Sequence, residues 1–274
     1  MANDSSLFEF EPRDGAVPLY EPRLLHQFDH RWATYIENQD DKTRDFTDAE
    51  KANPDTEVRP RYWVDQKHVD AKLGPNPPKY LMGWRNVTNA TNSRTVIAAV
   101  IPPVGAGNNF LLFEADATPQ LKACLLADMN SLSHDWGARQ KLQTPALNYF
   151  YKKQIPTLPP SVYTQSDIDY IVPRVLELTY TSHSLKDWAE ALGYDGAPFT
   201  FEPERRAQLR AELDAWYARR YGLNEEELKY ILDPASVFGD DYPSESFRVL
   251  KNDEIKTYGE FRTARLVLEA FRAL

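Results

Sequence analysis

A proline-rich segment, QIPTLPP at residues 154–160, divides the sequence into two parts with different hydrophobic patterns. Before it, short runs of β-branched and aromatic residues alternate with clusters of proline, glycine and asparagine, which is typical of strands joined by turns. After it, apolar residues recur three and four positions apart, which is the spacing of amphipathic helices. The sequence therefore predicts an α+β fold, with a strand-rich, mixed domain at 1–160 and a mainly helical region at 161–274.

Individual elements can be placed within both parts. The runs that favour strands are residues 61–64, 80–84, 94–101 and 109–113. One helix interrupts them, and we expect it to begin after Thr118, with Pro119 in its first turn, and to end before Gly137. Three pairs in the helical part have the spacing of a capping box: Ser184 with Asp187, Asn224 with Glu227, and Thr257 with Glu260.

The charge is distributed unevenly along the 274 residues, whose net charge is −9. Residues 61–160 hold 11 basic and 6 acidic side chains, whereas residues 1–60 and 161–274 each carry a net charge of −7. Salt screens charges beyond about 8–10 Å, so a phosphate backbone would respond to the local balance rather than to the total. The basic centre is therefore compatible with nucleic-acid binding.

Several classes of protein are disfavoured by the sequence. No apolar run approaches the roughly 20 residues that span a bilayer, and residues 1–15 lack the basic and apolar regions of a signal peptide. The single cysteine, Cys124, excludes a disulfide framework. We therefore expect a cytoplasmic protein that does not bind a membrane.

No set of residues has the spacing of a catalytic or metal site. Residues 76–79, NPPK, lack the aromatic fourth residue of the amino-methyltransferase motif, and no glycine-rich loop precedes them. Glu254 and Lys256 match half of a nuclease motif, and His26 and His30 are four residues apart without further ligands. We therefore expect a chain that is not an enzyme on its own and needs neither a metal nor another cofactor.

Residues 84–94, WRNVTNATNSR, concentrate side chains that can read nucleic acid. Asparagine pairs with adenine and arginine with guanine, while serine and threonine donate to phosphates; the same residue types also form ordinary turns. Further basic and amide residues follow the central helix. The predicted nucleic-acid contacts are Arg85, Asn86, Asn89, Asn92, Arg94, Arg139, Lys141, Asn148, Lys152 and Lys153, with Arg31, Arg61 and Trp63 as weaker candidates, of which Arg31 and Arg61 could instead form structural ion pairs.

Residues 20–35, YEPRLLHQFDHRWATY, resemble a segment of large type IIG (Eco57I-like) restriction–modification methylases, and the DISARM and BREX phage-defence methylases carry similar segments. Further matches follow in the same order at 59–64, 83–88, 94–99, 130–132, 138–141, 147–150 and 153–156, and in the tail at 221–232 and 258–262. In that family this stretch lies after the methyltransferase domain and contains the target recognition domain. The opening residues 1–8 resemble an internal segment of the family.

The resemblance implies a DNA sequence-recognition module of an adenine-N6 DNA methyltransferase or type II restriction–modification system. It would be the C-terminal part of a larger methylase, a separately encoded subunit or one half of a split gene. Its partners would be double-stranded DNA and a methyltransferase or restriction subunit, whose catalytic domain would bind S-adenosylmethionine. The alternative is a protein-interaction subunit or a degenerate methylase remnant that docks a partner methylase through its acidic helical half. A third possibility is a nuclease built around Glu254 and Lys256.

Overall fold

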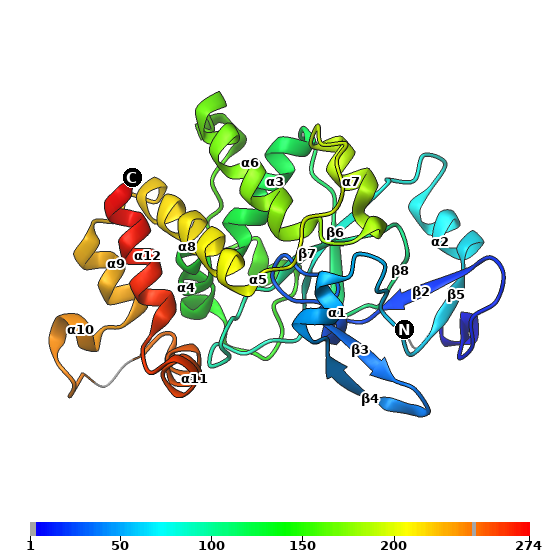
Figure 1. Ribbon diagram of the computed structural model, residues 1–274, viewed down its shortest axis with the longest axis horizontal. Helices are drawn as coiled ribbons and strands as arrows, with labels where there is room; N and C mark the ends of the chain where they lie inside the picture. The colour runs from blue at the N-terminus through cyan, green and yellow to red at the C-terminus, as the bar shows by residue number, and fades with distance from the viewer. Residues whose placement is uncertain (1–3, 243–244) are drawn as a thin grey trace. The chain divides into compact units, whose positions relative to one another are not determined.

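The structure is a computed structural model that describes residues 4–242 and 245–274. It confirms a mixed α+β fold, with strands mostly in the N-terminal half and helices in the C-terminal half (Figure 1). The chain forms two compact units. Unit 1 comprises Met1–Asn86, Ala98–Gln120 and Leu176–Phe201, and unit 2 comprises Val87–Ile97, Leu121–Val175 and Glu202–Leu274. Each unit is assembled from three stretches of chain, so neither coincides with a division at residue 160.

Unit 1 contains the strands. They are β1 (Phe8–Glu9), β2 (Ala16–Tyr20), β3 (Ala33–Ile36), β4 (Gln39–Asp45), β5 (Trp63–Asp65), β6 (Leu81–Arg85), β7 (Ala98–Ile101), β8 (Gly105–Ala106) and β9 (Phe110–Phe113). Its helices are the short turns η1 (Ser5–Leu7), η2 (Pro22–Leu24) and η4 (His183–Leu185), together with α1 (Asp48–Ala52), α2 (Gln66–Leu73) and α7 (Lys186–Ala191). The four predicted strand runs each overlap a strand.

The strands of unit 1 form three sheets. One has the order β1-β5-β2-β8, in which only the β2–β8 pair is parallel; the second is antiparallel with the order β7-β6-β9; and β3 and β4 form a hairpin. Gly83 lies at the centre of β6, and a Cβ there would lie 2.7 Å from the carbonyl oxygen of Leu111. That position therefore requires glycine. The core of unit 1 is formed by Tyr20, Leu24, Leu25, Tyr35, Phe46, Val58, Leu81, Ala99, Ile101 and Phe110.

Unit 2 is mainly helical. Its helices are α3 (Pro119–Asn130), α4 (Leu132–Lys141), α5 (Tyr149–Lys152), η3 (Pro160–Val162), α6 (Gln165–Thr179), α8 (Pro203–Arg220), α9 (Glu225–Leu232), α10 (Ala235–Phe238), α11 (Arg248–Tyr258) and α12 (Arg262–Ala273). The first two residues of α3 and the last four of α6 belong to unit 1. Helices α8 and α12 pack side by side (Figure 1). The core of unit 2 is formed by Leu132, Ala211, Ala215, Ala218, Leu228, Ile231, Leu232, Phe247, Val267, Ala270 and Phe271. Within the described residues, no helix is both long and apolar enough to cross a membrane.

The single central helix that the sequence predicts is in fact two helices, α3 and α4. Ser131 separates them, because its hydroxyl accepts a hydrogen bond from the amide of His134 and so begins a new helix. The carboxylate of Asp214 accepts the amide of Leu132 at 2.7 Å and satisfies a second donor at the same end. Gly137 therefore lies inside α4 rather than at the end of the predicted helix.

Of the three predicted capping boxes, only the pair of Asn224 and Glu227 is correct; it begins α9. Ser182, not Ser184, caps the turn before α7. Thr257 lies inside α11, where its hydroxyl donates to the carbonyl of Asp253. Both errors arise because the same spacing occurs within helices as well as at their starts.

Candidate nucleic-acid interface

The thirteen predicted contact residues belong to two different compact units. Unit 1 contains Arg31, Arg61, Trp63, Arg85 and Asn86, and unit 2 contains Asn89, Asn92, Arg94, Arg139, Lys141, Asn148, Lys152 and Lys153. The two units also differ in charge. Unit 1 has 13 basic and 22 acidic residues, whereas unit 2 has 19 of each. Unit 1 therefore carries the whole net charge of −9, and unit 2 presents less repulsion to a phosphate backbone.

Arg31 is a buried structural residue, with 1% of its surface exposed. Its guanidinium donates to the carbonyl oxygens of Lys51, Asn53, Thr56 and Thr181 at 2.7–2.9 Å. These bonds join α1 and the segment after it to the segment after α6. The prediction that Arg31 contacts nucleic acid is wrong for this conformation, because its donors are used within the protein.

The other four candidates in unit 1 lie on or next to its sheets. Trp63 is paired within β5, and the Arg61 guanidinium lies 5.0 Å from the centre of the Tyr62 ring. Arg85 ends β6, where burial lowers the pKa of its guanidinium to about 10. The Asn86 side chain donates to Asn109 at 3.3 Å. These residues are partly buried and do not form an exposed basic patch.

In unit 2, Arg94 and Arg139 point into the protein and stabilise the polar segment at residues 87–94, and their side chains do not extend into solvent. The Arg139 side chain is 4% exposed, and its guanidinium donates to the carbonyls of Ala90, Asn92, Ser93 and Ser246. Arg94 is also buried, with its guanidinium 3.7 Å from the carboxylate of Asp214. Both predictions of nucleic-acid contact are therefore corrected, because the two guanidinium groups face the interior.

Asp135 completes this clamp. Its carboxylate accepts hydrogen bonds from the amides of Thr95 and Val96, and from Nε of Arg139 at 2.7 Å. Buried charges are stable only when they are paired and hydrogen-bonded. Here Asp135 and Arg139 form the pair, and both also bind backbone groups of the segment that contains the loop. The result is a loop, residues 89–92, which is held by hydrogen bonds to the buried side chain of Arg139, the partner of Asp135.

The tip of this loop is exposed. The Asn89 side-chain oxygen accepts from the amide and hydroxyl of Thr91, which forms the turn that asparagine commonly makes. Asn89, Thr91 and Asn92 all face solvent. Two of the predicted asparagines therefore keep amide groups available for a ligand.

The loop is joined to the segment that contains α5. Val87 forms a β-bridge with Ala146, and the amide of Thr88 donates to the carbonyl of Pro145. Asn148 follows and caps α5 by accepting the amide of Tyr151. The end of α4 and the segment after α5 supply two exposed lysines, Lys141 and Lys153.

Helix α5 presents two aromatic residues that the sequence-based prediction missed. Tyr149 is 45% exposed and Phe150 is 70% exposed, in a protein where large apolar side chains are otherwise mostly buried. The only sign in the sequence that these rings could contact a ligand was their position between the predicted contacts Asn148 and Lys152. A Tyr-Phe-Tyr run by itself would suggest residues buried in the core. Here Ile155 and Leu147 are buried while these rings face solvent.

Lys152 differs from the neighbouring lysines because it is largely buried. Burial lowers its pKa to about 8, and the nearby carboxylate of Asp128 partly opposes that shift. Asp128 accepts hydrogen bonds from the hydroxyl of Tyr221 and the amide of Leu158, yet burial raises its pKa to about 6. Lys152 therefore belongs to this buried polar group rather than to the exposed surface.

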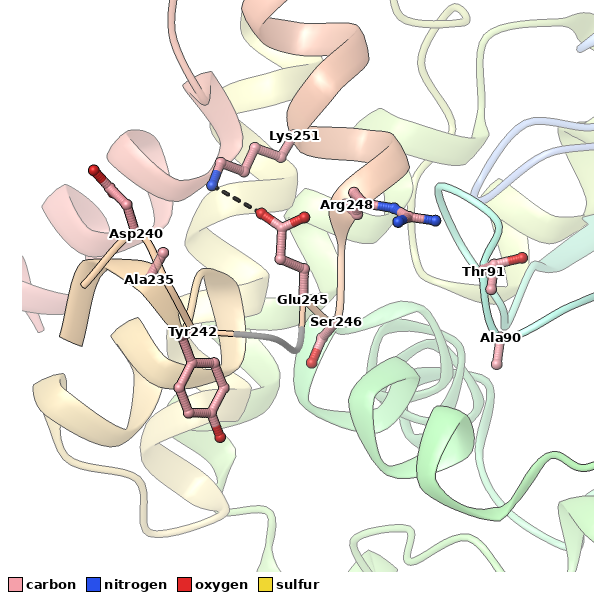
Figure 2. A pocket seen from close by; sticks show the side chains of 9 residues that line it. All are labelled: Ala90, Thr91, Ala235, Asp240, Tyr242, Glu245, Ser246, Arg248 and Lys251. Carbon is pink, nitrogen blue, oxygen red and sulfur yellow. Dashed lines mark hydrogen bonds and ion pairs between the residues drawn. The ribbon is translucent and has the colours of Figure 1, made fainter. Parts of the chain in front are cut away.

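A polar pocket of about 530 Å³ adjoins the loop (Figure 2). It is lined by Ala90, Thr91, Ala235, Asp240, Tyr242, Glu245, Ser246, Arg248 and Lys251. The Lys251 ammonium is paired with Glu245 and Asp233, whereas Arg248 is exposed and its guanidinium points toward the loop (Figure 2). Arg248 is a second residue that the sequence did not indicate, because it lies far from the loop along the chain.

We define the recognition surface as the exposed residues of this loop, of the end of α4, of the segment that contains α5 and of the adjoining pocket, all in unit 2. They are Asn89, Thr91, Asn92, Lys141, Asn148, Tyr149, Phe150, Lys153 and Arg248. The surface combines amides, aromatic rings and three basic groups. These are the groups that bind base edges, base faces and phosphates, respectively.

The remaining motifs have structural roles. Glu254 accepts the amide and hydroxyl of Thr263 and so supports the start of α12 instead of a nuclease site. His26 packs against Trp32, and His30 lies within hydrogen-bonding distance of the Ser184 hydroxyl. Cys124 is buried, which raises the pKa of its thiol to about 12. Across residues 4–242 and 245–274, no three His, Cys, Asp or Glu side chains lie where they could share a metal ion.

No protein-family model, curated protein or solved structure matches this chain.

Proposed function

We propose that this chain is the DNA sequence-recognition module of an adenine-N6 DNA methyltransferase or type II restriction–modification system. The observation that carries the proposal is the loop at residues 89–92, which Arg139 and Asp135 fix from beneath beside the exposed rings and lysines around α5. A rigid loop with an amide-rich tip is suited to reading base edges, because little conformational entropy is lost when it binds.

Each group of the recognition surface has a role in this proposal. The amides of Asn89 and Asn92 pair with base edges, while Lys141, Lys153 and Arg248 neutralise phosphates. Tyr149 and Phe150 stack on bases that are unpaired or partly unstacked. The target adenine is then methylated by a catalytic domain outside this chain, which supplies the S-adenosylmethionine site; the module itself uses no cofactor and acts in the cytoplasm, where the DNA is.

The proposal is tested by fluorescence anisotropy of the full chain with a labelled duplex pool of mixed sequence. Neutralising three phosphates gives a slope of about −2.7 in log affinity against log salt, so affinity should fall about 40-fold between 50 and 200 mM salt. Absence of binding at low salt, or binding that salt does not weaken, would refute the proposal.

Single variants separate the roles. Phe150→Ala should weaken binding about 5- to 100-fold through lost stacking, whereas Phe10→Ala, a ring of similar exposure in unit 1, should have no effect. Lys153→Ala should make the salt slope about 0.9 shallower, and Asn92→Ala should reduce sequence discrimination without changing that slope. Equal losses for Phe10→Ala and Phe150→Ala would place the binding surface elsewhere.

A further inference from the structure

A second pocket of unit 2 is formed by α9, α10 and the segment after α10, and it shares Tyr242 with the pocket that adjoins the loop at residues 89–92. Its volume is about 450 Å³, within the range of about 300–1,000 Å³ for ligand-binding clefts. It is lined by Asn224, Glu226, Glu227, Tyr230, Val237, Phe238 and Tyr242. The lining contains three aromatic rings and two carboxylates, and no basic residue.

The three rings form a fixed aromatic platform. Phe238 stacks on Tyr242 with ring centres 5.1 Å apart and 25° between the planes. Tyr230 meets both rings edge-on, with centres 5.8 and 6.3 Å away. Phe238 is 62% exposed despite these contacts, so much of its ring is presented to solvent. A ring held in this way loses little freedom when a ligand packs on it.

Part of the negative charge on α9 and after α10 is not neutralised by the residues that the structure describes. In the first turn of α9, Glu225 is paired with Lys229 and Arg272, and Glu227 accepts the amide of Asn224. Glu226 is exposed and forms no ion pair with any residue that the structure describes. The same holds, within residues 4–242 and 245–274, for Asp240 and Asp241, which follow α10.

We propose that this pocket binds an arginine-rich segment of a partner protein. A guanidinium can stack on the exposed face of Phe238 and reach the carboxylate of Glu226. Its aliphatic stem can pack on Val237, which a small hydrated cation could not do. Nucleic acid is excluded by the carboxylates, so this interaction goes beyond the proposed DNA recognition and does not depend on it.

The experiment is a fluorescence anisotropy titration of the full chain with a labelled peptide of alternating arginine and glycine. A second peptide carries citrulline in place of arginine, which keeps the shape of the side chain and removes its charge. We expect the arginine peptide to bind, and the citrulline peptide to bind at least tenfold more weakly because cation–π and ionic contacts are lost. Failure of the arginine peptide to bind at low salt, or equal binding of both peptides, would overturn the proposal.

Variants locate the site. Phe238→Ala should weaken binding of the arginine peptide about 2- to 30-fold, and Glu226→Gln should weaken it several-fold. The matched controls are Phe10→Ala, a ring of similar exposure in unit 1, and Asp253→Asn, an exposed carboxylate on α11; both should bind as the unchanged protein does. Circular dichroism confirms that each variant is folded. Unchanged affinity in both pocket variants would overturn the proposal, as would an equal loss of duplex binding in Phe238→Ala, which would assign the pocket to the DNA surface.

Discussion

Several arginine side chains in this protein bind its own backbone. The guanidinium groups of Arg31 and Arg139 each donate to four carbonyl oxygens, and Arg219 donates to the carbonyl of Phe271. A planar fork of five donors suits this role, because it can satisfy several carbonyls that no secondary structure pairs. For Arg139 the consequence is functional as well, since two of the carbonyls, those of Ala90 and Asn92, belong to the loop of the recognition surface.

Arg139→Met should therefore destabilise the protein and disorder the loop. It leaves the carboxylate of Asp135 buried without its cation, which costs about 3–5 kcal/mol. The control is Arg265→Met, because Arg265 pairs with Glu260 and Glu269 on the surface, where solvent screens the charges, and its loss should cost much less. Chemical denaturation measures both values, and equal costs would contradict the role assigned to Arg139.

Asp128 makes folding depend on pH. Burial raises its pKa from 3.8 to about 6, so the folded state holds the proton more tightly than the unfolded state does. This stabilisation is complete below pH 3.8 and is lost as the pH rises through about 6, and it corresponds to about 3 kcal/mol. Asp214 shifts in the same direction, whereas burial lowers the pKa of His134 and opposes both.

Asp128→Asn should remove the pH-dependent stabilisation that Asp128 causes and leave that of Asp214. The free energy of unfolding, measured by denaturant titration from pH 4 to 7, should decrease less with rising pH in the variant than in the unchanged protein. Asparagine can keep both hydrogen bonds, since its oxygen can accept the amide of Leu158 and its nitrogen can donate to the hydroxyl of Tyr221. An identical pH dependence in the two proteins would show that Asp128 does not titrate as described.

Among the elements, those set by local chemistry were predictable and those set by distant residues were not. The strand runs at 80–84 and 109–113 carry their own aromatic signal, and they form β6 and β9. The break between α3 and α4 depends partly on Asp214, which is 82 residues away from Leu132 in the sequence. No periodicity within residues 118–137 could have indicated that contact.

Two serines at the start of α4, Ser131 before its first residue and Ser133 within its first turn, test the capping role directly. Ser131→Ala removes the hydroxyl that accepts the amide of His134 and should cost about 1 kcal/mol of unfolding free energy. Ser133→Ala should be neutral or slightly stabilising, because the buried hydroxyl of Ser133 has no hydrogen-bond partner among the described residues. Thermal denaturation of both variants provides the comparison, and a greater loss for Ser133→Ala would argue against a cap at Ser131.

For the whole molecule, the decisive feature is that each compact unit draws on distant parts of the chain. The sequence correctly predicted strands before helices, because composition changes after residue 160. It could not show that residues 87–97 leave the sheet-forming part and join the helical unit, since that depends on the clamp formed by Asp135 and Arg139. The same reason explains the candidate site. The loop was predicted from its own residues, whereas Arg248 was not, because it is distant from the loop in the sequence and lies beside it only in the folded protein.

Cutting the chain at residue 160 should therefore leave two fragments that do not fold alone. Fragment 1–160 loses Thr181, which accepts from Arg31, and Trp188, a fully buried ring that contacts Tyr80. Removing one such ring costs about 3–5 kcal/mol, a large part of the stability of a typical domain. Fragment 161–274 loses α4 and with it Leu132 from the core of unit 2. Thermal melts followed by circular dichroism should show a cooperative transition for the full chain and none for either fragment; a cooperative melt of 161–274 would mean that the helical region is a domain in its own right.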